Sequence, residues 1–303
     1  MPLNAPYNKG REGVLFVVAT PIGNPDDITL RAIKVLKEVD FIAAEDTRQA
    51  KKLLASHGIS KPLVSCHEHN EQARTPQFVE RMKQGQSMAL ISDAGTPGLS
   101  DPGYRLVCGA LDAEITVIPI PGPSAPVAAL CASGLPTDAF HFAGFLPRKD
   151  GAAKARLEEL KSIRATLIFY ESPKRLLKSL PVMSLVLGDR RAVLARELTK
   201  THEEFLRGSF NDIMEQLKGR PAVLGECTVL VAGAQPPDPA ENEDAFMQAL
   251  EKGIAQGGLS LSTLAGSVAK RFGRKKAEVY ALALKIKEHP AKSPAVDKDP
   301  RLP

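Results

Sequence analysis

Apolar and polar positions in the first part of the chain follow two alternating patterns. Short apolar runs at 13–19, 40–44, 88–92 and 115–120 are typical of buried strands. Between these runs, apolar residues recur every three or four positions, which predicts amphipathic helices at 28–39, 47–57, 78–84, 104–111 and 124–131. Strands that alternate with helices favour an α/β fold with a mostly parallel sheet.

The pattern changes after the Ala-Ser-Gly-Leu-Pro segment at 132–136. Closely spaced apolar runs predict strands at 139–145, 165–170, 192–197, 204–207 and 226–231, with a charged helix at 152–163. Fewer helices between the strands favour an α+β domain with antiparallel pairing. A Pro-rich spacer at 235–239 precedes three predicted helices at 244–251, 260–272 and 274–287, and the last two match helix-turn-helix spacing. We therefore expect an α/β domain at 12–135, an α+β domain at 137–235, a helical domain at 241–289 and a disordered tail at 290–303.

Composition narrows the class of protein. The 303 residues are 43% hydrophobic and carry a net charge of +5, which is compatible with an anionic partner without proving one. No apolar run is long enough to span a bilayer, and the polar start lacks an apolar signal core. The four cysteines form no C-x-x-C pair, so we expect free thiols in a reducing cytoplasm.

The loop at 91–103, Ile-Ser-Asp-Ala-Gly-Thr-Pro-Gly-Leu-Ser-Asp-Pro-Gly, is the most informative segment. Its three glycines and two prolines end the preceding strand and prevent a helix before Gly103. In a parallel α/β sheet, ligands bind at the carboxyl ends of the strands. Asp93, Thr96, Ser100 and Asp101 offer polar contacts there.

Two further strand ends carry similar loops. One is the Thr-Pro-Ile-Gly-Asn segment at 20–24 and the other is Glu45-Asp46-Thr47-Arg48, although either could be only a turn and a helix cap. Neither G-x-G-x-x-G nor G-x-x-x-x-G-K-[ST] occurs, which excludes the common dinucleotide and P-loop signatures. The loops are expected to converge on one edge of the sheet.

Five segments in this order resemble the tetrapyrrole-methylase superfamily of S-adenosylmethionine-dependent methyltransferases. They are 18–24 (VATPIGN), 45–48 (EDTR), 92–98 (SDAGTPG), 121–125 (PGPSA) and 169–173 (FYESP). Within this superfamily they are most similar to the branch that methylates a cytidine 2′-oxygen in small-subunit (16S) ribosomal RNA. The resemblance covers residues 12–235, and the helical segment at 241–289 also fits that branch. It implies a homodimer that acts on small-subunit RNA or the 30S subunit.

The resemblance also implies a set of residues that bind S-adenosylmethionine between two domains. They are Pro21, Asp93, Gly95, Thr96, Leu99, Ser124 and Ala125 from the first domain, and Tyr170, Glu171 and Leu198 from the second. Relatives that methylate corrins typically have Gly-Asp-Pro where this chain has Gly95-Thr96-Pro97, which argues against a tetrapyrrole substrate.

A ribose hydroxyl needs a group that removes its proton. The candidates are Glu45, Asp46, His67 and Glu71, with Lys200 as an electrostatic helper, and Glu45 is favoured because it ends a strand. Cys66 and His69 alone are too few for a structural zinc site, so no metal is expected.

Basic side chains could bind RNA phosphates or could simply be solvated. The candidates are Arg48, the Pro-Lys-Arg segment at 173–175, Lys200, and the cluster Lys270, Arg271, Arg274, Lys275 and Lys276. Two rival functions remain open at this stage: a tetrapyrrole methyltransferase, and a non-enzymatic nucleic-acid-binding regulator.

Overall fold

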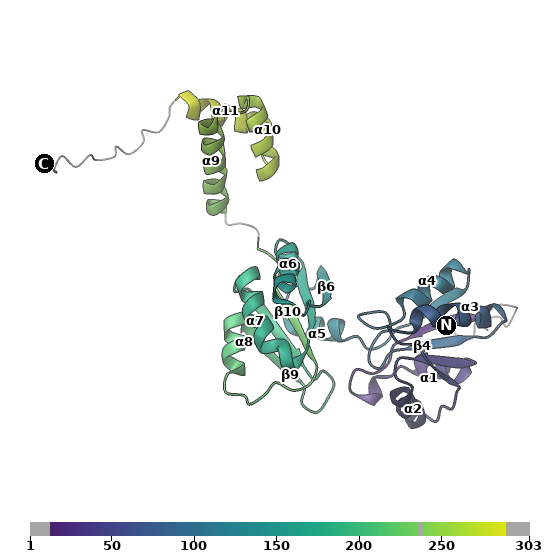
Figure 1. Ribbon diagram of the computed structural model, residues 1–303. Coiled ribbons are helices and arrows are strands. Elements are labelled where there is room, and N and C mark those ends of the chain that lie inside the picture. Colours follow the sequence, from purple (N-terminus) through teal and green to yellow (C-terminus); the bar gives the residue numbers. More distant parts are fainter. Residues whose placement is uncertain (1–12, 236–238, 289–303) are drawn as a thin grey trace. The chain divides into compact units, whose positions relative to one another are not determined.

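The computed structural model describes residues 13–235 and 239–288 (Figure 1). Its first part is a five-stranded sheet with the order β3-β2-β4-β1-β5, in which all neighbours are parallel. The strands are β1 (Val14–Val18), β2 (Phe41–Ala44), β3 (Leu63–Ser65), β4 (Met88–Ile91) and β5 (Thr116–Ile120). A short 3-10 helix, η1 (Pro25–Asp27), follows β1.

Helices cover both faces of this sheet. Residues of α1 (Leu30–Glu38) and α2 (Thr47–Ser56) pack into one apolar cluster with alternate strand residues. Residues of α3 (Glu71–Lys83) and α4 (Tyr104–Asp112) pack into a second cluster with the remaining strand residues. Because both faces are buried, the strands are almost continuously apolar, which is why their runs are clear in the sequence.

The second sheet has the order β6-β7-β10-β8-β9 and is mixed. Only β6 and β7 are parallel, and the other pairs are antiparallel. Its strands are β6 (Phe140–Phe145), β7 (Thr166–Glu171), β8 (Arg191–Arg196), β9 (Glu204–Ser209) and β10 (Cys227–Val231). One face is covered by α6 (Asp150–Leu160), α7 (Pro173–Leu187) and α8 (Phe210–Leu217).

The opposite face of the second sheet is covered by α5 (Ala125–Ser133). Ala129 and Leu130 of this helix pack against Ile168 and Val193 in an apolar cluster that also includes Ile22 of the first part. Sequence patterning assigned this helix to the first domain, whereas its buried side chains lie against the second sheet. The first element after β5 therefore already packs against the second sheet.

Residues 235–303 form a separate compact unit. Its described helices are α9 (Pro239–Gln256), α10 (Leu261–Phe272) and α11 (Lys276–Glu288), which enclose their own apolar core. Gly273, with φ 66°, ends α10 in the left-handed conformation and makes the turn to α11. Residues 236–238 of the predicted spacer and the predicted tail at 290–303 lie outside the described residues.

The fold class agrees with the sequence prediction, but several elements differ from it. No predicted range covers helix α7, and α9 extends five residues beyond the predicted 244–251 at each end. The strand β3 and the helix α8 were not predicted, because β3 has three half-buried residues and α8 is only two turns long. Helix α3 begins at Glu71, seven residues before the predicted start, despite an internal Pro76. Among the described residues, no helix is long and apolar enough to cross a membrane.

Candidate active site

The carboxyl ends of three parallel strands are joined by direct hydrogen bonds. Thr20, after β1, exchanges two backbone hydrogen bonds with Gly95, with N···O distances of 2.9 and 3.0 Å. The backbone N–H of Asp46, after β2, donates to the Asp93 carboxylate at 3.0 Å. Gly95 has φ 78°, so it takes the left-handed conformation that this close approach requires. The predicted convergence of these loops on one sheet edge is thus confirmed.

The turn between β8 and β9 packs onto the loop that follows β1. Asn24 donates its backbone N–H to the Thr199 hydroxyl at 3.0 Å. A Cβ on Gly23 would collide with side-chain atoms of Thr199 and Lys200, so glycine allows the contact. Thr199 and Glu197 both have left-handed backbones, with φ 65° and 52°. Such strain, in residues with side chains, is typical of functional sites and is held here by the contact between the two parts.

Three carboxylates gather beside this edge: Glu45, Asp93 and Asp101. Burial, and then the charge of Asp93, raise the pKa of Glu45. Burial, and then the charge of Glu45, raise the pKa of Asp101 to about 6, although a hydrogen bond from Ser92 opposes the shift. Among the described residues, no lysine or arginine forms an ion pair with any of the three. Arg48 is near enough for its charge to interact with Asp93, whereas Glu45 and Asp101 have no lysine or arginine partner in the described part of the chain, so this edge suits a cationic ligand and can accept a proton.

Asp46 differs from its neighbour Glu45. Its carboxylate accepts from the Arg48 backbone N–H at 2.8 Å and pairs with the Arg48 guanidinium at 2.6 Å. The hydrogen bonds from the Arg48 side chain and backbone lower the pKa of Asp46 to about 2. A carboxylate that is occupied as a helix cap and ion pair is a weak base, so the geometry disfavours Asp46 among the four candidates.

Glu71 is buried and holds the start of α4. Its Oε1 atom accepts hydrogen bonds from the backbone N–H groups of Gly103 and Leu106, both at 3.0 Å. These donors belong to the first turn of a helix, where backbone N–H groups lack partners within the helix. The structure thus uses Glu71 to position the end of the 91–103 loop, contrary to the expectation that it acts as a base.

Glu171 also differs from the expectation. Residues of β7 alternate, and Leu167 and Phe169 lie in the cluster beneath α6, α7 and α8. By this alternation the Glu171 side chain lies on the same face of β7 as Leu167 and Phe169. Its carboxylate accepts a hydrogen bond from Ser179 Oγ of α7 at 2.5 Å. Its side chain is therefore turned away from Tyr170 and cannot line the same site.

His67 lies close enough to Glu45 for its charge to lower the pKa of that carboxylate. Its Nε2 atom is 3.0 Å from the Asn70 side-chain nitrogen, and its buried Nδ1 atom has no hydrogen-bond partner. The neighbouring Cys66 is buried, which raises the pKa of its thiol to about 11 and keeps the thiol protonated. No group of three or more potential metal ligands occurs among the described residues.

Lys200 is ion-paired to two carboxylates, with Nζ 2.9 Å from Glu197 and 3.2 Å from Glu226. Its charge is thus largely balanced by the turn that it stabilises. This arrangement favours a structural contact with the Gly23 loop over the helper role that we expected.

Several of the predicted donor-binding residues lie around the start of α5. A small cavity is lined by Ile22, Ala125, Leu198, Glu226 and Thr228. Ser124 makes no side-chain cap, so the N–H groups in the first turn of α5 lack that partner, apart from Pro126, which has no N–H. Thr96 of the 91–103 loop donates from its hydroxyl to Pro123 O at 3.1 Å and brings that loop to the same place.

These features fit S-adenosylmethionine. The donor has a carboxylate, which suits a helix N-terminus, and cationic sulfonium and ammonium groups, which suit the acidic edge. Pro21 adjoins Ile22 in the same loop, while Leu99 is 43% exposed at the far end of its own loop. Thr96, Ser124, Ala125 and Leu198 therefore lie in one region, while the binding roles of these residues and of Pro21 remain predictions.

Two residues beside the site were not among the predicted site residues. Asp101 was named only as a polar contact, because its burial beside Glu45 depends on loop geometry that no local pattern reveals. Phe145, at the end of β6, is 55% exposed and lies 5.4 Å from the Tyr170 ring. No sequence signal distinguishes this phenylalanine from the other apolar residues of its strand.

Solved structures identify the class of fold. Uroporphyrin-III-C-methyltransferase from Thermus thermophilus matches with a TM-score of 0.51 and 20% identity, covering 73% of this chain and 94% of that one. A diphthine synthase matches with a TM-score of 0.54 and 17% identity, covering 73% and 90%. At this level of identity the likeness concerns the fold alone.

The sequence comparisons are more specific. A model of the family Tetrapyrrole (Corrin/Porphyrin) Methylases matches residues 14–214. "Ribosomal RNA small subunit methyltransferase I" of Mesorhizobium japonicum is 47% identical over 278 residues, or 91% of this chain and 93% of that protein. The protein of the same name from Micromonospora olivasterospora is 50% identical over 237 residues, or 78% and 75%. The chain belongs to the tetrapyrrole (corrin/porphyrin) methylase family.

Proposed function

We propose that this protein transfers a methyl group from S-adenosylmethionine to the ribose 2′-hydroxyl of a cytidine in small-subunit ribosomal RNA. The observation that carries this proposal is 47% to 52% identity with several curated ribosomal RNA small subunit methyltransferases I. With one of them the identity extends over 91% of the chain, beyond the residues that the family model matches. These relatives favour an RNA substrate over a tetrapyrrole, and the paired loops of the first sheet favour an enzyme over a DNA-binding regulator.

The donor side of the site is assigned to the start of α5 and the loops that meet it. S-adenosylmethionine supplies a methyl group that is activated by its bond to a positively charged sulfur. The free N–H groups at Ser124 and Ala125 bind an anionic group of the donor, and Pro21 and Leu198 provide apolar contact. Positioning of this kind can contribute about 7–11 kcal/mol to a two-substrate reaction.

The acceptor side is assigned to Glu45 and Asp101. The 2′-hydroxyl would pass its proton to one of these carboxylates as its oxygen bonds to the methyl carbon and the methyl–sulfur bond of the donor breaks, leaving a neutral thioether. Their raised pKa values make both stronger bases than ordinary surface carboxylates, and a base of this kind contributes about two to four decades in rate. His67, beside Glu45, lies where it can relay the proton onward.

A transfer assay tests the activity. Purified 30S subunits that lack the mark are incubated with tritium-labelled S-adenosylmethionine, and label in the RNA is mapped by mass spectrometry. The Gly95→Asp variant serves as control, because aspartate at φ 78° would strain the loop and crowd Ile22. Incorporation no greater than this control, or label on a base, would refute the proposed reaction.

The quaternary structure and the location are also proposals. The family resemblance supports a homodimer, and the four free cysteines suit a reducing cytoplasm. Analytical ultracentrifugation at micromolar concentration would detect the dimer, and a monomer at that concentration would refute it.

A further inference from the structure

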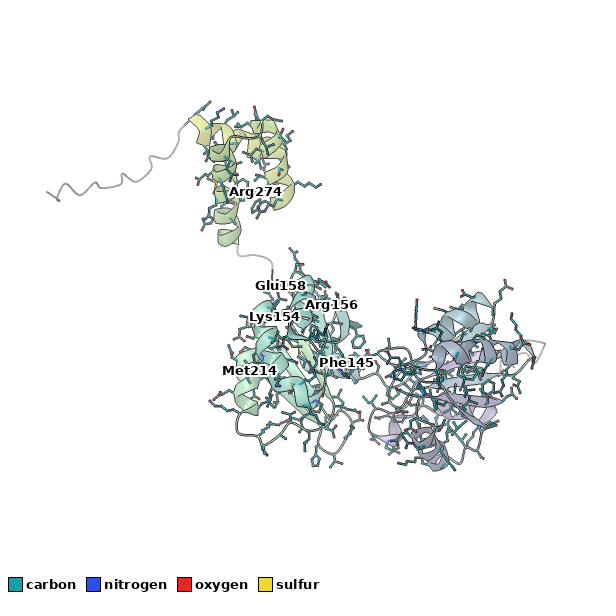
Figure 2. All side chains as sticks on the ribbon, in the orientation of Figure 1. Phe145, Lys154, Arg156, Glu158, Met214 and Arg274 are labelled. Carbon is teal, nitrogen blue, oxygen red and sulfur yellow. The ribbon has the colours of Figure 1, made fainter. Side chains whose placement is uncertain are left out.

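Phe145 is a large apolar side chain in an unusual position. It ends β6 and is 55% exposed, and Figure 2 shows it on the side of the second sheet away from Met214 of α8. Its ring centroid lies 5.4 Å from that of Tyr170, with the planes inclined at 54°. The Phe142 ring centroid lies 5.0 Å from that of the same Tyr170 ring, with the planes inclined at 75°. Three aromatic rings therefore form one cluster at the ends of two parallel strands.

A β-bulge creates this cluster. Phe142 pairs with Ile168, but the next paired residue, opposite Phe169, is Gly144, so β6 contains one extra residue. Because side chains alternate along a strand, the extra residue returns Phe145 to the face that carries Phe142 and Tyr170. Without the bulge, the ring would point towards α6 and α7 instead.

The same bulge connects the cluster with the candidate active site. Gly144 has φ 66°, and a Cβ there would lie 3.2 Å from the Ser100 hydroxyl of the 91–103 loop. The neighbouring Asp101 is close enough to Tyr170 to contribute to the raised pKa of its phenol, after burial. Tyr170 thus lies between Asp101 and Glu226, which lines the cavity at the start of α5, while the bulge beside Phe145 contacts the 91–103 loop next to Asp101.

We propose that Phe145, supported by Tyr170, stacks on an unpaired nucleobase of the RNA substrate and so holds the acceptor ribose beside Glu45 and Asp101. This inference rests on the proposed function. Planar bases stack on aromatic side chains without a strong sequence preference, with about 1–3 kcal/mol per base. The adenine of the methyl donor has the same stacking chemistry, and the position beside Ser100 favours the RNA base.

Four variants test the role of the ring. Phe145→Ala is expected to raise KM for 30S subunits about 5- to 150-fold, which corresponds to the stacking energy of one base. Phe145→Tyr should restore most of this loss, and Phe145→Leu should not, because leucine is apolar without a flat face. Phe140→Ala is the matched control, since Phe140 is 48% exposed at the other end of the same strand. The melting temperature of each variant should equal that of the wild type.

Two binding measurements separate the possible sources of the base. Calorimetry should give the same Kd for S-adenosylmethionine in wild type and Phe145→Ala. A fluorescent single-stranded RNA oligonucleotide should bind Phe145→Ala more weakly than Phe140→Ala. A rise in the Kd of the donor would place the ring on the donor side and overturn the inference, as would full rescue by leucine.

The outcome also distinguishes this inference from the proposed function. If the wild type labels the RNA but Phe145→Ala has an unchanged KM, only the stacking role fails. If the wild type labels no RNA while oligonucleotide binding still depends on the ring, the stacking role stands and the proposed reaction fails.

Discussion

Replacing Asp101 with asparagine is expected to stabilise the protein and, if Asp101 rather than Glu45 accepts the proton, to disable the site. The pKa of Asp101 rises from 3.8 to about 6, so its ionised form is unfavourable in the folded state. At about 1.4 kcal/mol per pKa unit, this difference corresponds to about 3 kcal/mol at neutral pH. Because the side chain is only partly buried, we reduce this figure to about 1–2 kcal/mol.

The gain should depend on pH in a defined direction. A carboxylate with a raised pKa retains its proton longer in the folded state, so wild-type stability falls as pH rises from about 4 to about 6. Asp101→Asn removes this loss. The extra stability of Asp101→Asn over the wild type should therefore be absent near pH 3.5 and complete above pH 6.5. There the variant should melt about 2–6 °C higher.

Thermal unfolding at pH 3.5, 5.0 and 7.5, with methyl transfer measured at pH 7.5, checks both effects. We expect kcat to fall by about two to four decades if Asp101 accepts the proton, and to change little if Glu45 does. Asp138→Asn, at an exposed carboxylate before β6, is the control and should alter neither quantity. An Asp101→Asn protein that is less stable at pH 7.5, or equally stabilised at pH 3.5, would refute the reasoning.

Three further predictions follow from other contacts. Glu71→Ala should lower the free energy of urea unfolding by about 2–4 kcal/mol, because it leaves two buried N–H groups at the start of α4 without an acceptor. Glu71→Gln should cost less, and an alanine variant as stable as the wild type would contradict this role. Glu204 accepts from Arg220 at 2.7 Å, and hydrogen bonds from that side chain lower the pKa of Glu204 to about 2. Glu204→Gln should therefore cost about 1 kcal/mol above pH 5 and nothing near pH 2, and an equal cost at both values would exclude the ion pair as the cause. Removal of 235–303 should raise KM for 30S subunits and leave the Kd of S-adenosylmethionine unchanged, whereas loss of donor binding would assign that unit a structural role.

Much of the fold was visible in the sequence because burial on both faces produces apolar runs. The strands β1, β2 and β4 are fully enclosed by helices on both sides, and their predicted ranges agree with the observed ones to within two residues. The three strand-end loops were also predictable, since glycine and proline punctuate the chain there. The strand β3 was missed because it lies at the sheet's edge with only half-buried residues, where no apolar run is required.

The candidate site was predictable only in part. Local sequence places Glu45 and Asp46 next to each other at the end of β2, and nothing in that dipeptide distinguishes their roles. Tertiary structure separates them, because Arg48 neutralises one carboxylate while burial and Asp93 raise the pKa of the other. The alternation of side chains along β7 can also be read from local sequence. Which of the two faces of β7 lies towards the first domain, however, depends on where α5 packs. The side chains of Tyr170 and Glu171 therefore diverge in a way that required coordinates.

The order of strands and helices, the loops that end them and the family resemblance could all be read from local sequence, since these features depend on residues close together in the chain. Tertiary structure alone decided that Glu71 holds α4, that Asp101 lies beside Glu45, and that a single extra residue in β6 turns Phe145 towards the site. This is because pKa values, buried hydrogen bonds and ring contacts depend on groups far apart in sequence, such as Asn24 and Thr199, which are 175 residues apart. Only packing brings such groups within reach of each other.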